Sequence, residues 1–113
     1  METEQTFRKL VLLYPGVIES PHFEKTSFRS NNKIFATWDA GKKLACVKLN
    51  EIDQSVFCKI DSNIIYPVNN KWGKQGWTII EPGKIKPALL KDLLSKAFTE
   101  VNQKKKNSKT KLL

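Results

Sequence analysis

Apolar residues along the chain follow two spacings, which predict where helices and strands lie. In an N-terminal and a long C-terminal segment they recur every three or four positions, as one face of a helix requires. The N-terminal set is Phe7, Leu10, Val11 and Tyr14. The C-terminal set is Leu89, Leu90, Leu93, Leu94, Ala97, Phe98 and Val101. Pro15-Gly16 should end the first helix, and Pro87 suits the first turn of the last one.

The region after the first helix favours strands. Thr26–Ser30 and Lys33–Trp38 are rich in strand-forming residues and flank Asn31-Asn32. Asparagine tolerates the left-handed conformation that a two-residue hairpin turn needs, so these segments should form a β-hairpin. A second turn at Asp39–Lys42 leads to a third strand at Lys43–Leu49. We therefore expect a three-stranded meander.

A central helix should separate this meander from a second hairpin. Asn50 can cap the helix, and Asp53 would lie near its positive end. Ile52, Val56 and Ile60 fall on one face of that helix.

The second hairpin joins two strands through a longer, ordered loop. Ile64–Val68 reads as a strand in which Pro67 requires an edge or a bulge, and Trp77–Ile80 reads as its partner. Asn69–Gly76 forms the loop between them. The element order predicts an α+β domain, with an antiparallel sheet of about five strands and helices packed on one face.

Composition and charge define the expected domain and its partners. The chain has 113 residues, 40% of them hydrophobic, and a formal net charge of +9. Residues 1–101 should form a single domain, and residues 102–113, with five lysines and no acid, a basic disordered tail. The segment Lys25–Lys48 holds six cationic residues against Asp39 alone. Such a surface attracts polyanions or merely keeps a protein soluble.

The sequence also allows expectations about the cellular compartment and the oligomeric state. No apolar run approaches the roughly 18 residues of a membrane span, and Glu2 and Glu4 stand where a signal peptide would be basic. We expect a cytoplasmic monomer with no membrane partner.

Three sequence signatures resemble those of the MmcQ/YjbR-like family. They are HFEKTSFR from His22, KIFAT from Lys33 and KWGKQGWT from Lys71. The resemblance extends from about Tyr14 to Val101 and implies a CyaY-like fold. It also implies DNA binding through a double wing, meaning two β-hairpins presented to the duplex. The chain departs from the family pattern at Glu24, where many relatives have glycine, and at Asn31-Asn32, where a more apolar pair is usual.

Six residues are the candidate DNA contacts: Lys25, Arg29, Lys33, Lys71, Trp72 and Lys74. The cations would neutralise backbone phosphates with little dependence on sequence. Trp72 would stack on a sugar or base or wedge into a groove. A structural reading stays open for two of them, because Arg29 could pair with Glu24 and Trp72 could plug its loop. Trp77 is expected in the core.

A binding module without a nucleic-acid role is the alternative function. In it, a groove between the hairpins, around Phe28, Arg29 and Trp72, would hold a small acidic ligand or a protein partner.

No enzyme, cofactor or metal site is expected. The acidic ridge with which frataxin-type proteins collect metal is missing from the first helical region. His22 is the only histidine and reads as a packed or capping residue. Cys46 and Cys58 lie twelve positions apart, fit neither a disulfide framework nor a zinc site, and read as buried thiols.

Overall fold

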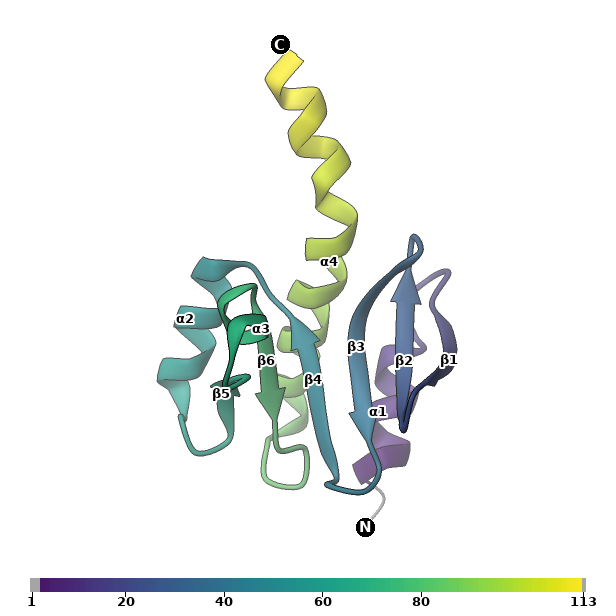
Figure 1. Cartoon of the computed structure of the whole chain (residues 1–113), viewed down its shortest axis with the longest axis vertical. Coiled ribbons are helices and arrows are strands. Elements are labelled where there is room, and N and C mark those ends of the chain that lie inside the picture. The colour runs from purple at the N-terminus through teal and green to yellow at the C-terminus, as the bar shows by residue number, and fades with distance from the viewer. Residues whose placement is uncertain (1–2, 113) are drawn as a thin grey trace.

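A six-stranded antiparallel sheet forms the centre of the molecule (Figure 1). The computed structural model describes the backbone of residues 3–112 and the side chains of residues 4–102. The strands are β1 (Ile18–His22), β2 (Lys25–Ser30), β3 (Lys33–Asp39), β4 (Leu44–Lys48), β5 (Ile65–Pro67) and β6 (Trp77–Ile80). Their order in the sheet is β1-β2-β3-β4-β6-β5.

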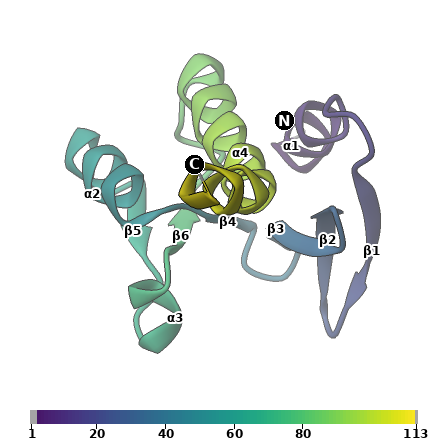
Figure 2. The same ribbon diagram turned by 90° about the horizontal axis from the view of Figure 1, so that it is seen from above.

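The helices lie on both sides of this sheet in unequal numbers. They are α1 (Thr3–Val11), α2 (Glu51–Ile60), α3 (Lys71–Lys74) and α4 (Pro87–Leu112). The longer helices α1, α2 and α4 cover one face, whereas the single turn α3 projects from the other (Figure 2). The expected α+β class is confirmed, with six strands in place of about five. The three longer helices pack on one face as expected, and α3 is the exception.

The core between the sheet and the helices is built on aromatic contacts. Phe7 of α1 lies edge-on to Phe28, with ring centroids 5.8 Å apart, and its ring centroid is 5.7 Å from that of Trp38. On α4, Phe98 stacks on Tyr14 at 4.8 Å and meets Phe35 edge-on at 5.7 Å. Apolar burial of this kind is the main favourable term in folding, and the predicted apolar faces of the first and last helices contribute to it.

Local signals placed the first hairpin and the central helix correctly. Asn31 and Asn32 adopt φ values of 57° and 65°, which is the left-handed turn that joins β2 to β3. Asn50 caps α2, because its Oδ1 accepts a hydrogen bond from the Asp53 N–H at 2.7 Å.

The apolar face expected on α2 does not enter the core. Ile52, Val56 and Ile60 are all more than half exposed, and α2 packs through Phe57, which is buried. The helix is therefore rotated so that Phe57, rather than its aliphatic stripe, packs into the core.

Two elements were not predicted, β1 and α3. β1 is an edge strand in which three of the five residues are exposed, and its sequence, IESPH, does not alternate apolar and polar residues. α3 is one turn inside the expected loop between β5 and β6. The other edge strand of the sheet is β5, which has three residues and ends at Pro67. An edge position was expected for this strand, because proline has no N–H to donate to a neighbouring strand.

The last helix extends past the end of the sheet (Figure 1). Its last described side chain, Asn102, donates hydrogen bonds through Nδ2 to Ser30 Oγ at 3.0 Å and to the Phe98 carbonyl at 2.9 Å. Within the expected tail, the backbone of residues 102–112 belongs to α4, but side chains from residue 103 onward lie outside the described residues. The division into a domain at 1–101 and a tail at 102–113 stays a prediction. Within residues 3–112, no helix combines the length and apolarity needed to cross a membrane.

The Asn50 cap can be tested by substitution. We expect Asn50→Ala to lower the free energy of unfolding by about 1 kcal/mol, because an N–H of the first turn of α2 loses its acceptor. Asn50→Asp should retain most of that stability, since a carboxylate also accepts this bond. Urea unfolding measures both variants, and an equal loss in the two would contradict the capping role.

Candidate functional site

The face of the sheet opposite α1, α2 and α4 carries the candidate site. We call it the open face; its central residues are Ile34, Thr37, Cys46, Lys48, Trp77 and Ile79. Along β4, Ala45 and Val47 are buried against the helices while Cys46 and Lys48 between them are partly exposed. This alternation is the two-residue period of a strand with one solvated face.

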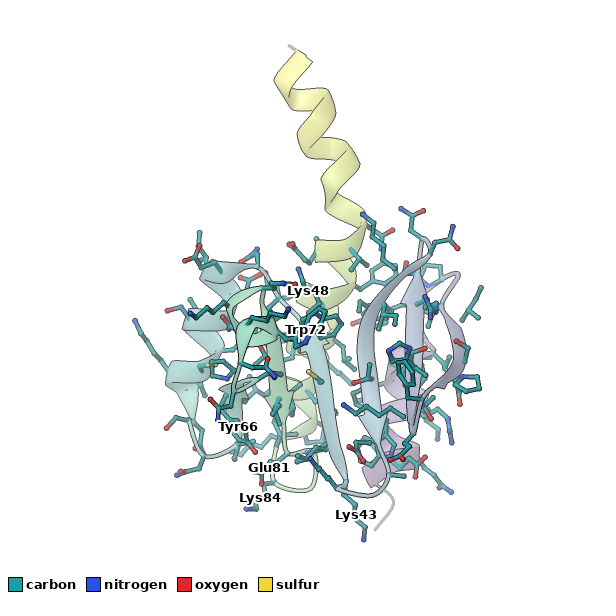
Figure 3. The ribbon with its side chains drawn as sticks, in the orientation of Figure 1. Lys43, Lys48, Tyr66, Trp72, Glu81 and Lys84 are labelled. Carbon is teal, nitrogen blue, oxygen red and sulfur yellow. The ribbon has the colours of Figure 1, made fainter. Side chains whose placement is uncertain are left out.

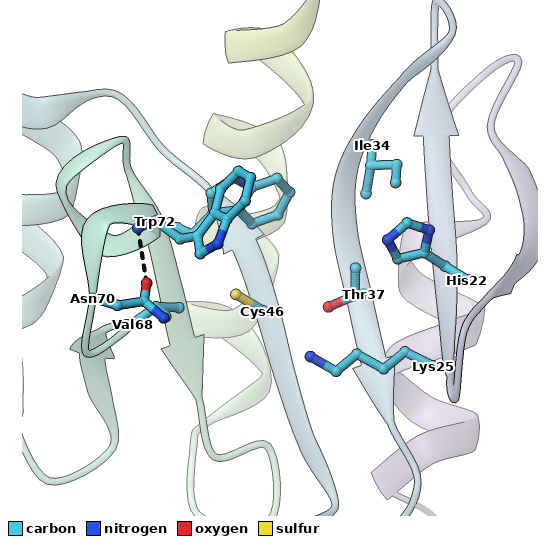
Figure 4. A pocket seen from close by; sticks show the side chains of 9 residues that line it. His22, Lys25, Ile34, Thr37, Cys46, Val68, Asn70 and Trp72 are labelled. Carbon is cyan, nitrogen blue, oxygen red and sulfur yellow. Dashed lines mark hydrogen bonds between the residues drawn. The ribbon is translucent and has the colours of Figure 1, made fainter.

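Two segments project from the open face (Figure 2). One is the turn between β1 and β2, and the other is α3. Between them lies a groove lined by residues of both segments. The groove has a volume of about 510 Å³. Its lining, drawn in Figure 4, consists of His22, Lys25, Ile34, Thr37, Cys46, Val68, Asn70, Trp72 and Trp77. This set includes one cation, two indoles and no carboxylate.

Two glycines fix the wall formed by α3. A side chain at Gly73 would overlap the carbonyl oxygen of Val68, and one at Gly76 would overlap the carbonyl oxygen of Leu49. Gly76 also has φ +109°, which L-residues rarely adopt. The glycines of the WGKQGW signature therefore have a structural role, because they let α3 lie directly against the neighbouring backbone.

Side-chain amides complete the attachment of α3. Gln54 of α2 donates through Nε2 to the Gly73 carbonyl at 2.9 Å and to Thr78 Oγ1 at 3.1 Å. Asn70 Oδ1 accepts from the Trp72 N–H at 2.8 Å and caps the turn (Figure 4). The position of Trp72 over the groove is thus determined by backbone packing and by two amide side chains.

The opposite wall is the end of the β1–β2 hairpin. His22 and Lys25 pair across the strands, with Phe23-Glu24 as the turn between them. Ser27 Oγ donates to the Ser20 carbonyl at 3.0 Å and ties the two strands together. The His22 ring lies edge-on to Phe23 at 4.9 Å. His22, expected to be a packed or capping residue, is instead a groove residue.

The structure brings only two of the six candidate residues into the groove itself, Lys25 and Trp72. Their side chains extend from opposite walls, and Lys25 points toward Cys46 (Figure 4). Lys71 and Lys74 line a second hollow of about 470 Å³, which Gln54 of α2 also lines. Lys71 Nζ lies 6.0 Å from the centroid of the Trp72 ring.

Arg29 and Lys33 line neither hollow. Arg29 lies between buried Phe28 and Ser30, whose hydroxyl faces Asn102 of α4, so the strand period directs Arg29 to the open face. Lys33 follows the hairpin turn at the start of β3. The expectation that Phe28 lies at the groove is wrong, because Phe28 is 1% exposed and belongs to the core.

The two indoles also differ from the sequence expectations. Trp72 is 49% exposed, which does not fit a buried loop plug. Trp77 was expected in the core, but it lies on the open face and lines the groove. β6 has Thr78 and Ile80 on its buried side, so Trp77 falls on the exposed side of the strand.

Carboxylates pair away from the groove. Among the described side chains, Arg8 pairs with Glu19 at 2.9 Å and with Glu4 at 3.6 Å, and Lys84 pairs with Glu81 at 3.2 Å. The alternative pair of Arg29 with Glu24 is not formed among these side chains.

Glu81 lies at the far end of the open face from Trp72 and Lys48 (Figure 3). Tyr66 donates its hydroxyl to Glu81 Oε2 at 2.7 Å, and this bond, with Lys84, lowers the pKa of the Glu81 carboxyl. Glu81 therefore stays ionised but is occupied by its own partners. None of these ion pairs includes Lys25, Arg29, Lys71 or Lys74. No carboxylate of the described side chains therefore neutralises these four cations, which can pair with an anionic ligand.

Sequence reasoning missed Lys48, His22 and Phe23 as residues of this region. Lys48 is opposite Trp77 in the β4–β6 register and lies at the same end of the open face as Trp72 (Figure 3). The alternation of β4 contained this signal. His22 and Phe23 could have been found only by pairing β1 with β2.

Cys46 is the thiol that lines the groove, and its environment opposes reactivity. Burial raises the pKa of the Cys46 thiol to about 11, and nearby Lys25 offsets this only in part. The thiol is therefore protonated at neutral pH. Among the described residues, no three His, Cys, Asp or Glu side chains cluster as metal ligands would.

The antiparallel sheet with its longer helices on one face defines an α+β domain. The family model described as YjbR matches residues 12–100, so the chain belongs to the YjbR family. A crystal structure of the Deinococcus radiodurans protein DR2400, with a DUF419 domain, superposes with a TM-score of 0.79. The two sequences are 19% identical, over 92% of this chain and 81% of that chain, which shows a common fold. No curated protein matches the chain.

The close approach at Gly76 predicts a large effect of one methyl group. We expect Gly76→Ala to lower the free energy of unfolding by about 3 kcal/mol, through backbone strain and overlap with Leu49. Gly16→Ala is the matched control, because Gly16 also has positive φ, +76°, but open space around it. It should cost only about 1 kcal/mol. Equal losses in thermal unfolding would show that overlap plays no part.

The protonated state of Cys46 can be tested by alkylation. With its pKa near 11, Cys46 should react with iodoacetamide about 100-fold more slowly than an unperturbed thiol at neutral pH, because little thiolate is present. The rate should rise about tenfold per pH unit until the pH reaches the pKa. Mass spectrometry of the labelled peptides measures this rate, and rapid labelling of Cys46 at pH 7 would contradict the assignment.

Proposed function

We propose that this protein binds DNA through phosphate contacts on the open face of its sheet, with little dependence on base sequence. The observation that carries the proposal is the charge around the groove. Lys25 lines it, Arg29 is the register partner of the lining residue Ile34, and Lys71 and Lys74 line the second hollow beside α3. Among the described side chains, these four form no ion pair and no carboxylate lines the groove. Lysines and arginines that neutralise phosphates release bound counterions, which is the main source of non-specific affinity for nucleic acid.

The geometry divides the contacts between two segments. Lys25 and Arg29 belong to β2, while Lys71 and Lys74 belong to α3, with the groove between the two. A strand of DNA crossing the groove would meet cations on both sides. In this proposal the phosphate contacts position the nucleic acid and carry no information about its base sequence.

A small acidic ligand in the groove is the second candidate. A volume of about 510 Å³ lies within the usual range of roughly 300 to 1,000 Å³ for ligand sites. Lys25 would supply the charge partner and the indole rings of Trp72 and Trp77 the apolar contact.

Salt dependence distinguishes a polyanion from a small ligand. With about six phosphate contacts, the logarithm of the association constant should fall with the logarithm of salt concentration with a slope of about −5. We expect Lys25→Gln combined with Lys74→Gln to reduce that slope by about two, since two contacts are lost. Lys96→Gln together with Lys91→Gln, two exposed positions on α4, is the control with equal charge change and should keep the slope.

Fluorescence anisotropy with labelled DNA at several salt concentrations measures these slopes. Replacing the five lysines of residues 102–113 by glutamine in the full chain should weaken binding without abolishing it. Complete loss in that variant would place the polyanion site in the tail. A small acidic metabolite that stabilises the protein thermally, with no measurable DNA binding, would favour the second candidate.

A further inference from the structure

Phe23 occupies a position that folding alone does not favour. It is the first residue of the β1–β2 turn, its φ is +58°, and its side chain is 94% exposed. A bulky residue is an outlier in the left-handed region, where glycine or asparagine would be more stable. Exposure of the whole ring adds no apolar burial in return. The turn therefore carries an aromatic ring at the expense of its own stability.

The location of Phe23 suggests a use for the ring. It lies at the end of one groove wall, in edge contact with His22, which lines the groove. The other wall presents Trp72, 49% exposed, and Trp77 lies beside it in the lining. Trp72 and the His22 ring thus face the groove from opposite walls, and Phe23, next to His22, lies just outside the lining as an exposed ring at the tip.

The charge pattern separates aromatic from phosphate contacts. The hairpin tip has an exposed acid, Glu24, next to Phe23, and a phosphate at the tip would be repelled. Lys25, the next residue and the first of β2, instead has its side chain turned into the groove (Figure 4). A ligand that matches this pattern places planar apolar groups against the aromatic rings and anionic groups against Lys25.

Unpaired nucleotides have this chemistry, whereas a duplex does not present it. Base faces in a duplex are stacked on one another, and a hollow of about 510 Å³ is the size of a small-ligand site, not of a double helix. Single strands leave base faces free to stack on aromatic side chains while their phosphates follow a cationic groove.

We propose that the groove takes unpaired nucleobases, stacked on Phe23 and Trp72, so that the preferred ligand is single-stranded nucleic acid. This inference rests on the proposed function and deepens it. Phosphate contacts supply the general affinity, and base stacking supplies the preference for an unpaired strand.

The experiment compares three polyanions at one salt concentration. They are an oligo-dT of about 12 nucleotides, within the known range of site sizes, a duplex of the same length, and inorganic polyphosphate. We expect the oligo-dT to bind most tightly and to quench tryptophan fluorescence. Phe23→Gly and Trp72→Leu should each weaken oligo-dT binding by about 5- to 100-fold and leave polyphosphate binding unchanged.

Phe23→Gly provides a readout that a structural role would not give. Because glycine favours the left-handed turn, this variant should unfold at the same temperature as the natural chain or higher, while it binds oligo-dT less well. Ile52→Ala is the matched control, since Ile52 is 73% exposed and lies on α2, away from the groove. It should bind oligo-dT as the natural chain does.

Two outcomes overturn the inference alone. One is equal binding of oligo-dT, duplex and polyphosphate; the other is unchanged oligo-dT binding in Phe23→Gly. With either result, the proposal of phosphate-led DNA binding still stands.

Failure of every nucleic acid to bind would overturn the proposed function as well. Binding of free thymidine monophosphate as tight as that of oligo-dT would assign the groove to a small nucleotide and also overturn the preference for a strand.

Discussion

The open face depends on one close backbone contact, where the chain at Gly73 and Gly76 lies against the carbonyl groups of Val68 and Leu49. Only glycine permits this approach. This close contact holds α3 against the neighbouring backbone. Gln54 of α2 adds hydrogen bonds to the Gly73 carbonyl of α3 and to Thr78 of β6. Without it, Trp72 would have no fixed position and the groove would lose one wall. A fold-level contact thus creates the site.

The distribution of acids gives that site its charge. Glu19 is engaged by Arg8, and Glu81 by Tyr66 and Lys84, all outside the groove. The sheet buries apolar residues toward its helices and leaves lysine, threonine and indole side chains on the open face. The family assignment and the shared fold say nothing about a ligand, so the functional argument rests on this chain's own surface.

Local chemistry could be predicted from sequence, and long-range pairing could not. Asn31-Asn32 and Asn50 act through neighbouring residues, so their turn and cap were correctly predicted. β1 exists because it pairs with β2 at the sheet edge, and its own residues give no strand signal. Lys25 and Trp72 were identified as candidates from their own chemistry. The hairpin wall with His22 and Phe23 was missed, because it exists only through the pairing of β1 with β2. Trp77 was misplaced because the two faces of β6 differ only through tertiary packing.

Both edge strands of the sheet contain a proline, Pro21 in β1 and Pro67 in β5. A proline has no N–H to donate, so neither edge offers a complete hydrogen-bonding template to the edge of another copy. Pairing between the edges of two copies would extend the sheet from chain to chain, and a proline interrupts such a ladder. The two prolines therefore disfavour growth of the sheet at either edge, whatever the open face binds.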